Sequence, residues 1–286
     1  MSGLAAGVLA MAVAVAGGCE SAPPPAIAPD GGAGAAAPAG AVEVMYVANE
    51  GVLISAGDER VLIDGLHREY SASYPFLPEP HRSAIESAQA PFDGVDIVLV
   101  SHRHLDHFHP ESVGRHLVSA REAVLVSSAQ VVGEVEAQFA DFASIRSRVT
   151  AVTPSVGART TTRVSGIDLV VLGVGHGSGR HSGIQNLGHV VTVGGRKFLH
   201  LGDAATEDRT IFEKLRLHQD GIDVAFLPIW FLTEPDGQAI VRDLIRPREI
   251  VAVHMPAGEA TDARARAQRD FPTAAFFTTL LERRRY

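Results

Sequence analysis

Two successive blocks of the chain share one pattern, in which short strands come first and strands alternating with helices follow. In the first block, the apolar segments 42–48, 52–56 and 60–64 are separated by tight turns and predict three strands. Segment 95–100 is a continuous apolar run, which is typical of a strand buried on both faces. The second block repeats this order. The repeat predicts an α/β fold in which two sheets pack together with helices outside, a four-layer αββα sandwich.

The other predicted elements follow from the same periodicities. We expect helices at 113–121, 129–139, 206–217 and 238–245, and strands at 123–127, 167–174, 187–193, 197–201, 224–228 and 250–254. No linker-like composition interrupts residues 42–286, so we expect this region to form one domain. Residues 66–92, which are rich in Pro, Ser, Tyr and His, break the regular pattern. They are either a substrate lid or an ordinary surface loop.

The N-terminal region predicts export and membrane attachment. Residues 1–18 contain 13 apolar residues and no charged side chain, which is typical of a secretory signal. The run ends in Ala16-Gly17-Gly18-Cys19, which resembles a bacterial lipobox with Cys19 as the lipidated residue. Residues 19–41 consist of 18 Ala, Pro and Gly out of 23, which is typical of a tether. We therefore expect an exported lipoprotein facing the periplasm or the cell surface, held to the membrane only by its lipid.

Histidine is unusually abundant, with 13 residues, and cysteine occurs once. Directly after the buried strand 95–100 come His102, His104, Asp106 and His107 in the pattern HxHxDH. Residues two apart in an extended segment point to the same side, so His102 and His104 can bind one metal ion. Asp106 and His107 can bind a second ion. Imidazole and carboxylate ligands suit Zn²⁺ and related divalent ions.

This motif resembles the signature of the metallo-β-lactamase fold superfamily, and the resemblance extends over residues 42–286. Four further elements resemble those of the family, and with the motif all five occur in the family's order: these are the segments with Asp64, His176, Asp203 and His254. The resemblance implies one metal ion held by His102, His104 and His176, and another held by Asp106, His107 and His254. It also implies that Asp203 bridges the two ions, and that Asp64 buttresses the ligand loop from behind.

The third histidine ligand has competitors in His181 and His189. His189 falls inside a predicted strand and His181 in a Gly-rich loop, whereas His176 comes at a strand end, as the family requires. Arg180 and His181 then become candidate substrate contacts, and His67 is a third at the rim after Asp64. For His109, His116, His200 and His218 we expect no role in the site.

Local patterns around the site are similar to those of two branches of the superfamily. These are the ascorbate-6-phosphate lactonase-like proteins and the N-acyl-phosphatidylethanolamine phospholipase D group, which His176-x3-Arg180 resembles. Because the sole cysteine lies in the tether, a cysteine metal ligand of the β-lactamase type is excluded. A net charge of −8 argues against a nucleic-acid partner that is bound through bulk charge. We expect the substrate to be a small molecule or a lipid.

The resemblance implies a dinuclear hydrolase in which a hydroxide between two metal ions attacks an ester, lactone or phosphodiester. Asp106, His102, His104 and His107 are the residues expected to carry the chemistry. Zinc is the favoured metal, with manganese or iron as alternatives. Two other functions use the same site. One is an iron-dependent redox protein, and the other is a non-catalytic metal-binding lipoprotein.

Overall fold

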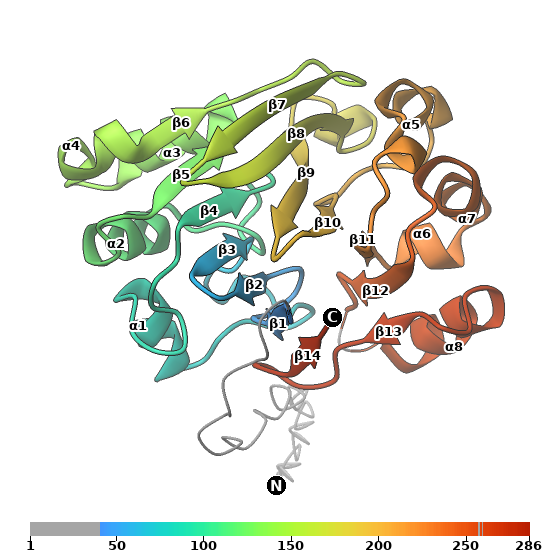
Figure 1. Cartoon of the computed structure of the whole chain (residues 1–286), viewed down its shortest axis with the longest axis horizontal. Helices are drawn as coiled ribbons and strands as arrows, with labels where there is room; N and C mark the ends of the chain where they lie inside the picture. The colour runs from blue at the N-terminus through green and yellow to red at the C-terminus, as the bar shows by residue number, and fades with distance from the viewer. Residues whose placement is uncertain (1–40, 257, 259) are drawn as a thin grey trace, which may run out of the picture.

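Two seven-stranded sheets face each other across an apolar interior, as Figure 1 shows for the computed structural model. The structure describes residues 41–256, 258 and 260–286. The predicted signal (1–18), Cys19 and the tether up to residue 40 lie outside the described residues, so export and lipidation stay predictions. None of the helices in the described part of the chain is long and apolar enough to cross a lipid bilayer.

The first sheet has the order β14-β1-β2-β3-β4-β5-β6. Its strands are β14 (Arg283–Arg285), β1 (Glu43–Tyr46), β2 (Val52–Ala56), β3 (Glu59–Ile63), β4 (Ile97–Val100), β5 (Val124–Ser127) and β6 (Val149–Ala151). The meander β1-β2-β3 is antiparallel, and β3 to β6 run parallel. Both arrangements agree with the predicted sequence of turns and crossovers.

The second sheet has the order β13-β12-β11-β10-β9-β8-β7. Its strands are β13 (Ala275–Phe276), β12 (Glu249–Val253), β11 (Val224–Pro228), β10 (Arg196–His200), β9 (Gln185–Val193), β8 (Ile167–Gly175) and β7 (Arg159–Val164). Here β7 to β10 form the antiparallel meander, and β10 to β13 run parallel.

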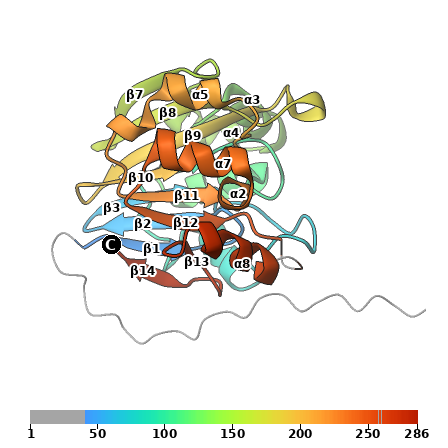
Figure 2. The same cartoon turned by 90° about the vertical axis from the view of Figure 1, so that its right-hand side faces the viewer.

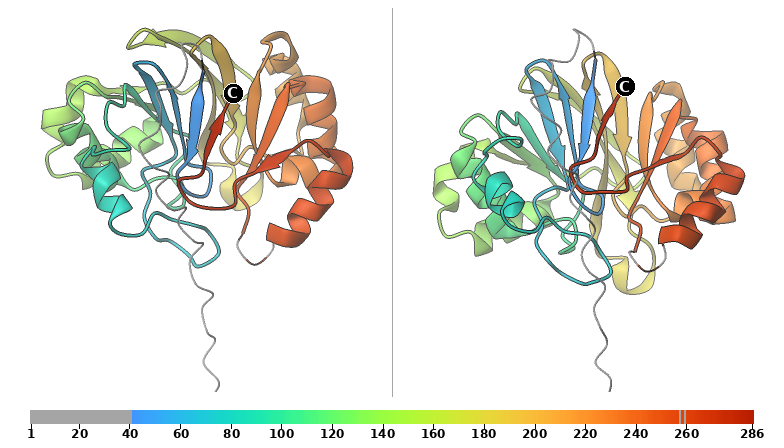
Figure 3. Two further views of the ribbon diagram at one scale, coloured as in Figure 1. Left: turned by 60° about the horizontal axis from the view of Figure 1, so that its bottom comes forward. Right: turned by 90° about the horizontal axis from the view of Figure 1, so that it is seen from below.

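Helices cover the outer face of each sheet, which confirms the four-layer sandwich (Figures 1 and 3). The first sheet carries α1 (His81–Glu86), α2 (Pro110–Ser119), α3 (Ala129–Gln138) and α4 (Phe142–Ile145). The second carries α5 (Arg209–Leu215), α6 (Trp230–Thr233), α7 (Pro235–Ile240) and α8 (Ala260–Asp270); Figure 2 shows this layer from outside. Three apolar cores result, one between the sheets and one under each helical layer.

Several elements lie where the sequence predicted none, each for a physical reason. Strand β14 consists of three arginines and pairs with β1, so no apolar alternation marks it. Helix α8 buries only Ala263 and Ala267, which are too small to produce an apolar stripe. Strand β7 is a Thr-rich edge strand. The helix predicted at 206–217 is shorter, because Asp208 caps it at the start and Arg216 leaves the helix with φ +54°.

His189 lies in the interior between the two sheets, where it is fully buried and neither ring nitrogen has a hydrogen-bond partner among the described residues. Burial lowers its pKa to about 3. Because the folded pKa lies below the unfolded value of about 6.5, the unfolded chain binds this proton first as the pH falls. The stability is full above pH 6.5 and is lost progressively from there down to about pH 3.

We expect His189→Leu to remove part of this pH dependence. Between pH 7.5 and pH 5, the titration of one such histidine costs about 2 kcal/mol of unfolding free energy. Urea unfolding at the two pH values measures the difference. His218→Gln, which changes an exposed histidine, serves as the control. An equal pH dependence in the wild type and His189→Leu would contradict the prediction.

Candidate metal centre

Eight polar side chains gather at one end of the sandwich because every strand that supplies them points the same way. His102 to His107 follow β4, and Asp64 follows the parallel neighbour β3. In the second sheet His176 follows β8, Asp203 follows β10 and His254 follows β12. Leu187 N donates to Ser101 O (2.9 Å), which joins the two sheets directly beneath this rim. The carboxyl ends of both sheets therefore form one site.

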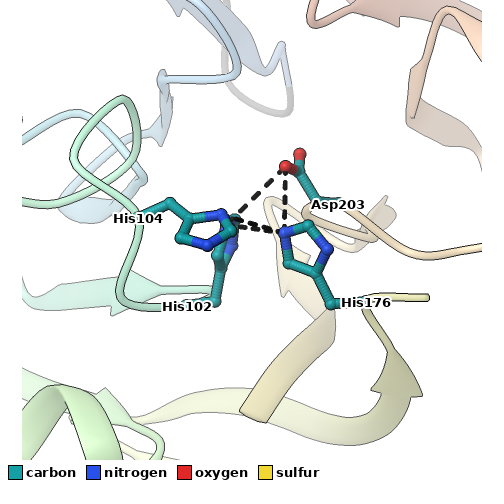
Figure 4. A group of neighbouring side chains, drawn as sticks. All are labelled: His102, His104, His176 and Asp203. Carbon is teal, nitrogen blue, oxygen red and sulfur yellow. Dashed lines mark hydrogen bonds and ion pairs between the residues drawn. The ribbon is translucent and has the colours of Figure 1, made fainter. Parts of the chain in front are cut away.

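The first cluster contains His102, His104, His176 and Asp203 (Figure 4). His176 Nε2 lies 3.2 Å from His102 Nε2 and 3.0 Å from His104 Nδ1. Asp203 Oδ2 lies 3.2 Å from His176 Nε2 and 3.7 Å from His102 Nε2. Three ring nitrogens and one carboxylate oxygen thus converge from three separate segments, a donor set that suits a tetrahedral zinc site.

The second cluster contains Asp106, His107 and His254. His254 Nε2 lies 3.4 Å from Asp106 Oδ2, and His107 Nε2 lies 3.6 Å from the same oxygen. Asp203 reaches this cluster with its other oxygen, because Oδ1 lies 3.2 Å from both His107 Nε2 and His254 Nε2. The two oxygens of Asp203 therefore face different clusters.

Three atoms at the second cluster are buried without a hydrogen-bond partner among the described residues: His107 Nε2, Asp203 Oδ1 and His254 Nε2. Leaving a buried polar atom unpaired costs about 1–3 kcal/mol. Their convergence on one point is what a cation would satisfy. The donor set therefore fits a metal ion at this cluster as well.

Asp64 orients two histidines, His107 directly and His102 through Ser101. Its carboxylate accepts from Ser101 N (2.7 Å), Ser101 Oγ (2.5 Å) and His107 Nδ1 (2.9 Å). Since the Ser101 hydroxyl proton goes to Asp64, His102 Nδ1 donates to Ser101 Oγ (3.0 Å). These bonds leave the Nε2 lone pairs of His102 and His107 pointing into the site.

Gly202 lets the Asp203 turn approach the ligand loop. Its φ is +52°, and a Cβ atom there would lie 2.5 Å from Ser101 Cβ. From beneath, His200 Nδ1 accepts from Gly202 N (3.1 Å), while His200 Nε2 donates to Glu50 O (3.0 Å). His200 therefore supports the turn that carries Asp203. Both of its ring nitrogens are used in these hydrogen bonds, so His200 is a member of neither cluster.

The charges of the site are arranged for a cation. Burial lowers the pKa of His102 well below 6.5 and that of His104 to about 4, so both are neutral ligands at pH 7. Burial also opposes the charge of His107, but Asp203 and Asp64 outweigh it and raise the pKa of that ring. Burial raises the pKa of Asp106, yet His254 and His107 lower it further, to about 2. A metal ion would replace the proton that the carboxylates hold on His107.

Glu50 is a residue of this region that the sequence pattern placed only in a tight turn. Its side chain is fully buried, with Oε2 lying 3.6 Å from His200 Nε2 and 3.9 Å from His107 Nδ1. Burial raises its pKa well above 4.5. The neighbouring Asn49, at φ +51°, donates from Nδ2 to Asp106 O (3.2 Å). The sequence signal that could have indicated these residues is an amide followed by a carboxylic acid, Asn49-Glu50, in the turn before a buried strand.

Two aromatic side chains pack against His254. The Tyr74 ring lies 4.8 Å and the Trp230 ring 5.1 Å from the His254 ring, both at steep angles. Tyr74 comes from the loop that precedes α1, so part of the 66–92 region does reach the site. Trp230 Nε1 donates to Ala204 O (2.9 Å), next to Asp203. Trp230 is also the only tryptophan of the chain.

The three predicted substrate contacts lie at different depths. The His181 ring stacks on the His176 ring at 4.9 Å, and Arg180 Nε donates to His181 Nε2 (2.9 Å), so both border the first cluster. His67 is only 4% exposed, and neither of its ring nitrogens has a hydrogen-bond partner among the described residues. Contact of any of the three with a substrate stays a prediction.

Both a family model and curated relatives with similar sequences indicate one protein family. The family model described as "Beta-lactamase superfamily domain" matches residues 59–277. A UPF0173 metal-dependent hydrolase from Thermus thermophilus is 30% identical over 220 residues, which are 74% of this chain and 83% of the relative. Another from Pyrococcus abyssi is 27% identical over 219 residues, which are 74% of this chain and 84% of that relative.

Solved structures show the same fold at low identity. A metallo hydrolase from Ignicoccus hospitalis superposes with a TM-score of 0.57 at 14% identity, covering 86% of this chain and 98% of that one. A diiron β-hydroxylase from Streptomyces venezuelae gives 0.54 at 18% identity over 86% of this chain, which spans about half (54%) of that protein. From the family model, the relatives and the fold together, the chain belongs to the metallo-β-lactamase superfamily.

Proposed function

We propose that this chain is a dinuclear metal-dependent hydrolase that cleaves an ester, lactone or phosphodiester. The observation that carries the proposal is the position of Asp203, whose Oδ2 faces His102 and His176 while its Oδ1 faces His107 and His254. A carboxylate shared in this way would hold an ion at each cluster. The relatives from Thermus and Pyrococcus, which carry the name metal-dependent hydrolase, support the same class.

The residues that would hold the metal ions are those of the two clusters. Two divalent ions, when bound, supply Lewis acidity and a water of lowered pKa that attacks a carbonyl or phosphoryl centre at neutral pH. We propose zinc as the metal, because three imidazoles and one carboxylate oxygen form the first cluster.

The protein's own side chains prepare the site for this attack. Asp106 stays ionised at pH 7, and Asn49 holds it in place, so its Oδ2 can accept a hydrogen bond from the attacking water. Arg180 and His181 border the first cluster and can contact the leaving group or an anionic part of the substrate. Tyr74 and Trp230 enclose His254 and exclude water from that side.

The test measures metal content, metal binding and turnover on the full chain. We expect two ions per chain, and a change in Trp230 fluorescence as Zn²⁺ or Mn²⁺ is added to the stripped protein. His254→Ala should lose this change, because its ring lies 5.1 Å from the indole. A panel of lactones, phosphodiesters, N-acyl phospholipids and β-lactams then identifies the reaction. Iron with oxygen uptake and no hydrolysis would establish the redox alternative instead.

A further inference from the structure

A cavity of about 540 Å³ opens beside the second cluster. It meets the site at two residues: His254, and Asn49, which holds Asp106. Its described walls come from five separate parts of the chain, namely the end of β1 with the turn after it, the loop before α1, the end of β12, the start of α8 and the segment after β13. This volume is in the range of pockets that enclose a small organic ligand.

Most of the wall is apolar. Met255, Leu280, Ala252 and Val253 line the cavity together with the rings of Tyr46 and Phe277, which stack at 4.7 Å and 8°. A stacked pair is a rigid wall, since neither ring can turn without losing the contact. Entry of a hydrocarbon chain or an aromatic group would be favourable by about 25 cal/mol for each Å² of apolar surface that it removes from water.

Among the described residues that line the same cavity, one has a charged side chain. This side chain is Arg264 of α8, whose guanidinium lies 4.9 Å from the centre of the Phe276 ring. No aspartate or glutamate is among the described residues that line the cavity. A cation on a mostly apolar wall favours an anionic group on the ligand, because a guanidinium binds a carboxylate or phosphate through paired hydrogen bonds.

We infer that this cavity binds the non-reacting part of the substrate, and that the substrate is an amphiphilic anion. It has a hydrocarbon body that contacts Tyr46 and Phe277, and a carboxylate or phosphate that pairs with Arg264. The inference rests on the proposed hydrolase, because the scissile bond would lie next to His254 at the mouth of the cavity. It adds a substrate class that the metal ligands alone do not define.

The test is binding, measured by titration calorimetry on the zinc-loaded full chain, so it needs no turnover. The probes are decanoate, decyl phosphate and 1-decanol, which share one chain length. We expect the anions to bind more tightly than the alcohol, and Arg264→Ala to reduce this preference about tenfold. Arg266→Ala, on the exposed side of the same helix, is the matched control and should keep the preference. The bound metal attracts the anions equally in all three proteins.

A second variant tests the cavity itself. Thr279→Trp places a large ring into the space and should weaken all three probes together, with circular dichroism to confirm folding. A larger loss for decyl phosphate than for decanoate in Arg264→Ala would identify phosphate as the natural group, and the reverse would identify carboxylate. An anion preference unchanged in Arg264→Ala, unchanged affinities in Thr279→Trp, or no binding of any probe would each overturn the inference. None of these results bears on whether the chain hydrolyses a substrate.

Discussion

Asp203→Asn is expected to abolish turnover while leaving the fold intact. The substitution keeps the size of the side chain but replaces one of two oxygens with an NH₂ group, which cannot bind a cation. Whichever cluster then faces the nitrogen loses a ligand, because Oδ1 and Oδ2 serve different clusters. Replacing a residue that merely orients a ligand already costs 10–100-fold in metal affinity or activity, so a bridging ligand should cost more than about 100-fold in kcat/KM.

Metal analysis distinguishes this effect from a general loss of structure. We expect the metal content to fall from two ions per chain to one or none. Asp168→Asn, at an exposed position of β8, is the control and should retain both ions and full activity. Two tightly bound ions together with wild-type kcat/KM in Asp203→Asn would exclude Asp203 as the bridge and, with it, the dinuclear proposal.

Asp64→Asn is expected to weaken both metal binding and stability, although Asp64 belongs to neither cluster and acts on His107 through a hydrogen bond. Its carboxylate accepts three hydrogen bonds in a fully buried position. An amide offers one oxygen to those donors and turns an NH₂ group toward the others. We expect a loss of about 2–4 kcal/mol in unfolding free energy and a 10–100-fold loss in zinc affinity, since the His107 ring is no longer held.

Asp223→Asn is the matched control for Asp64→Asn. Asp223 also accepts from a backbone N–H, that of Lys197 (2.9 Å), and from a side chain, Arg248 (2.8 Å). It should therefore lose stability without losing zinc affinity. Urea unfolding of the metal-free proteins and competition with a chromogenic chelator measure the two effects separately. If both variants bound zinc equally well, Asp64 would be a structural residue and not one that orients a metal ligand.

The sequence determined the fold and much of the candidate site because both leave local patterns. Apolar runs at 52–56, 95–100 and 224–228 mark strands that the structure places within three residues of the expected bounds. The HxHxDH pattern lies on one turn, and its spacing alone brings four side chains to one place. Elements without an apolar period, such as α8 and β14, were not predictable, since only their tertiary neighbours stabilise them.

Only the tertiary structure decided how the separate segments share their atoms. The sequence does not show that one carboxylate oxygen of Asp203 faces His176 and the other faces His254. Nor does the sequence show that Glu50 lies buried beneath the site, or that Tyr46, Phe277 and Arg264 line one cavity. The local periodicity of apolar residues shows which face of a helix or strand is buried, because apolar residues recur on that face at the period of the element. Contacts between residues far apart in the sequence depend on how the two sheets meet, and that arrangement determines the chemistry of this site.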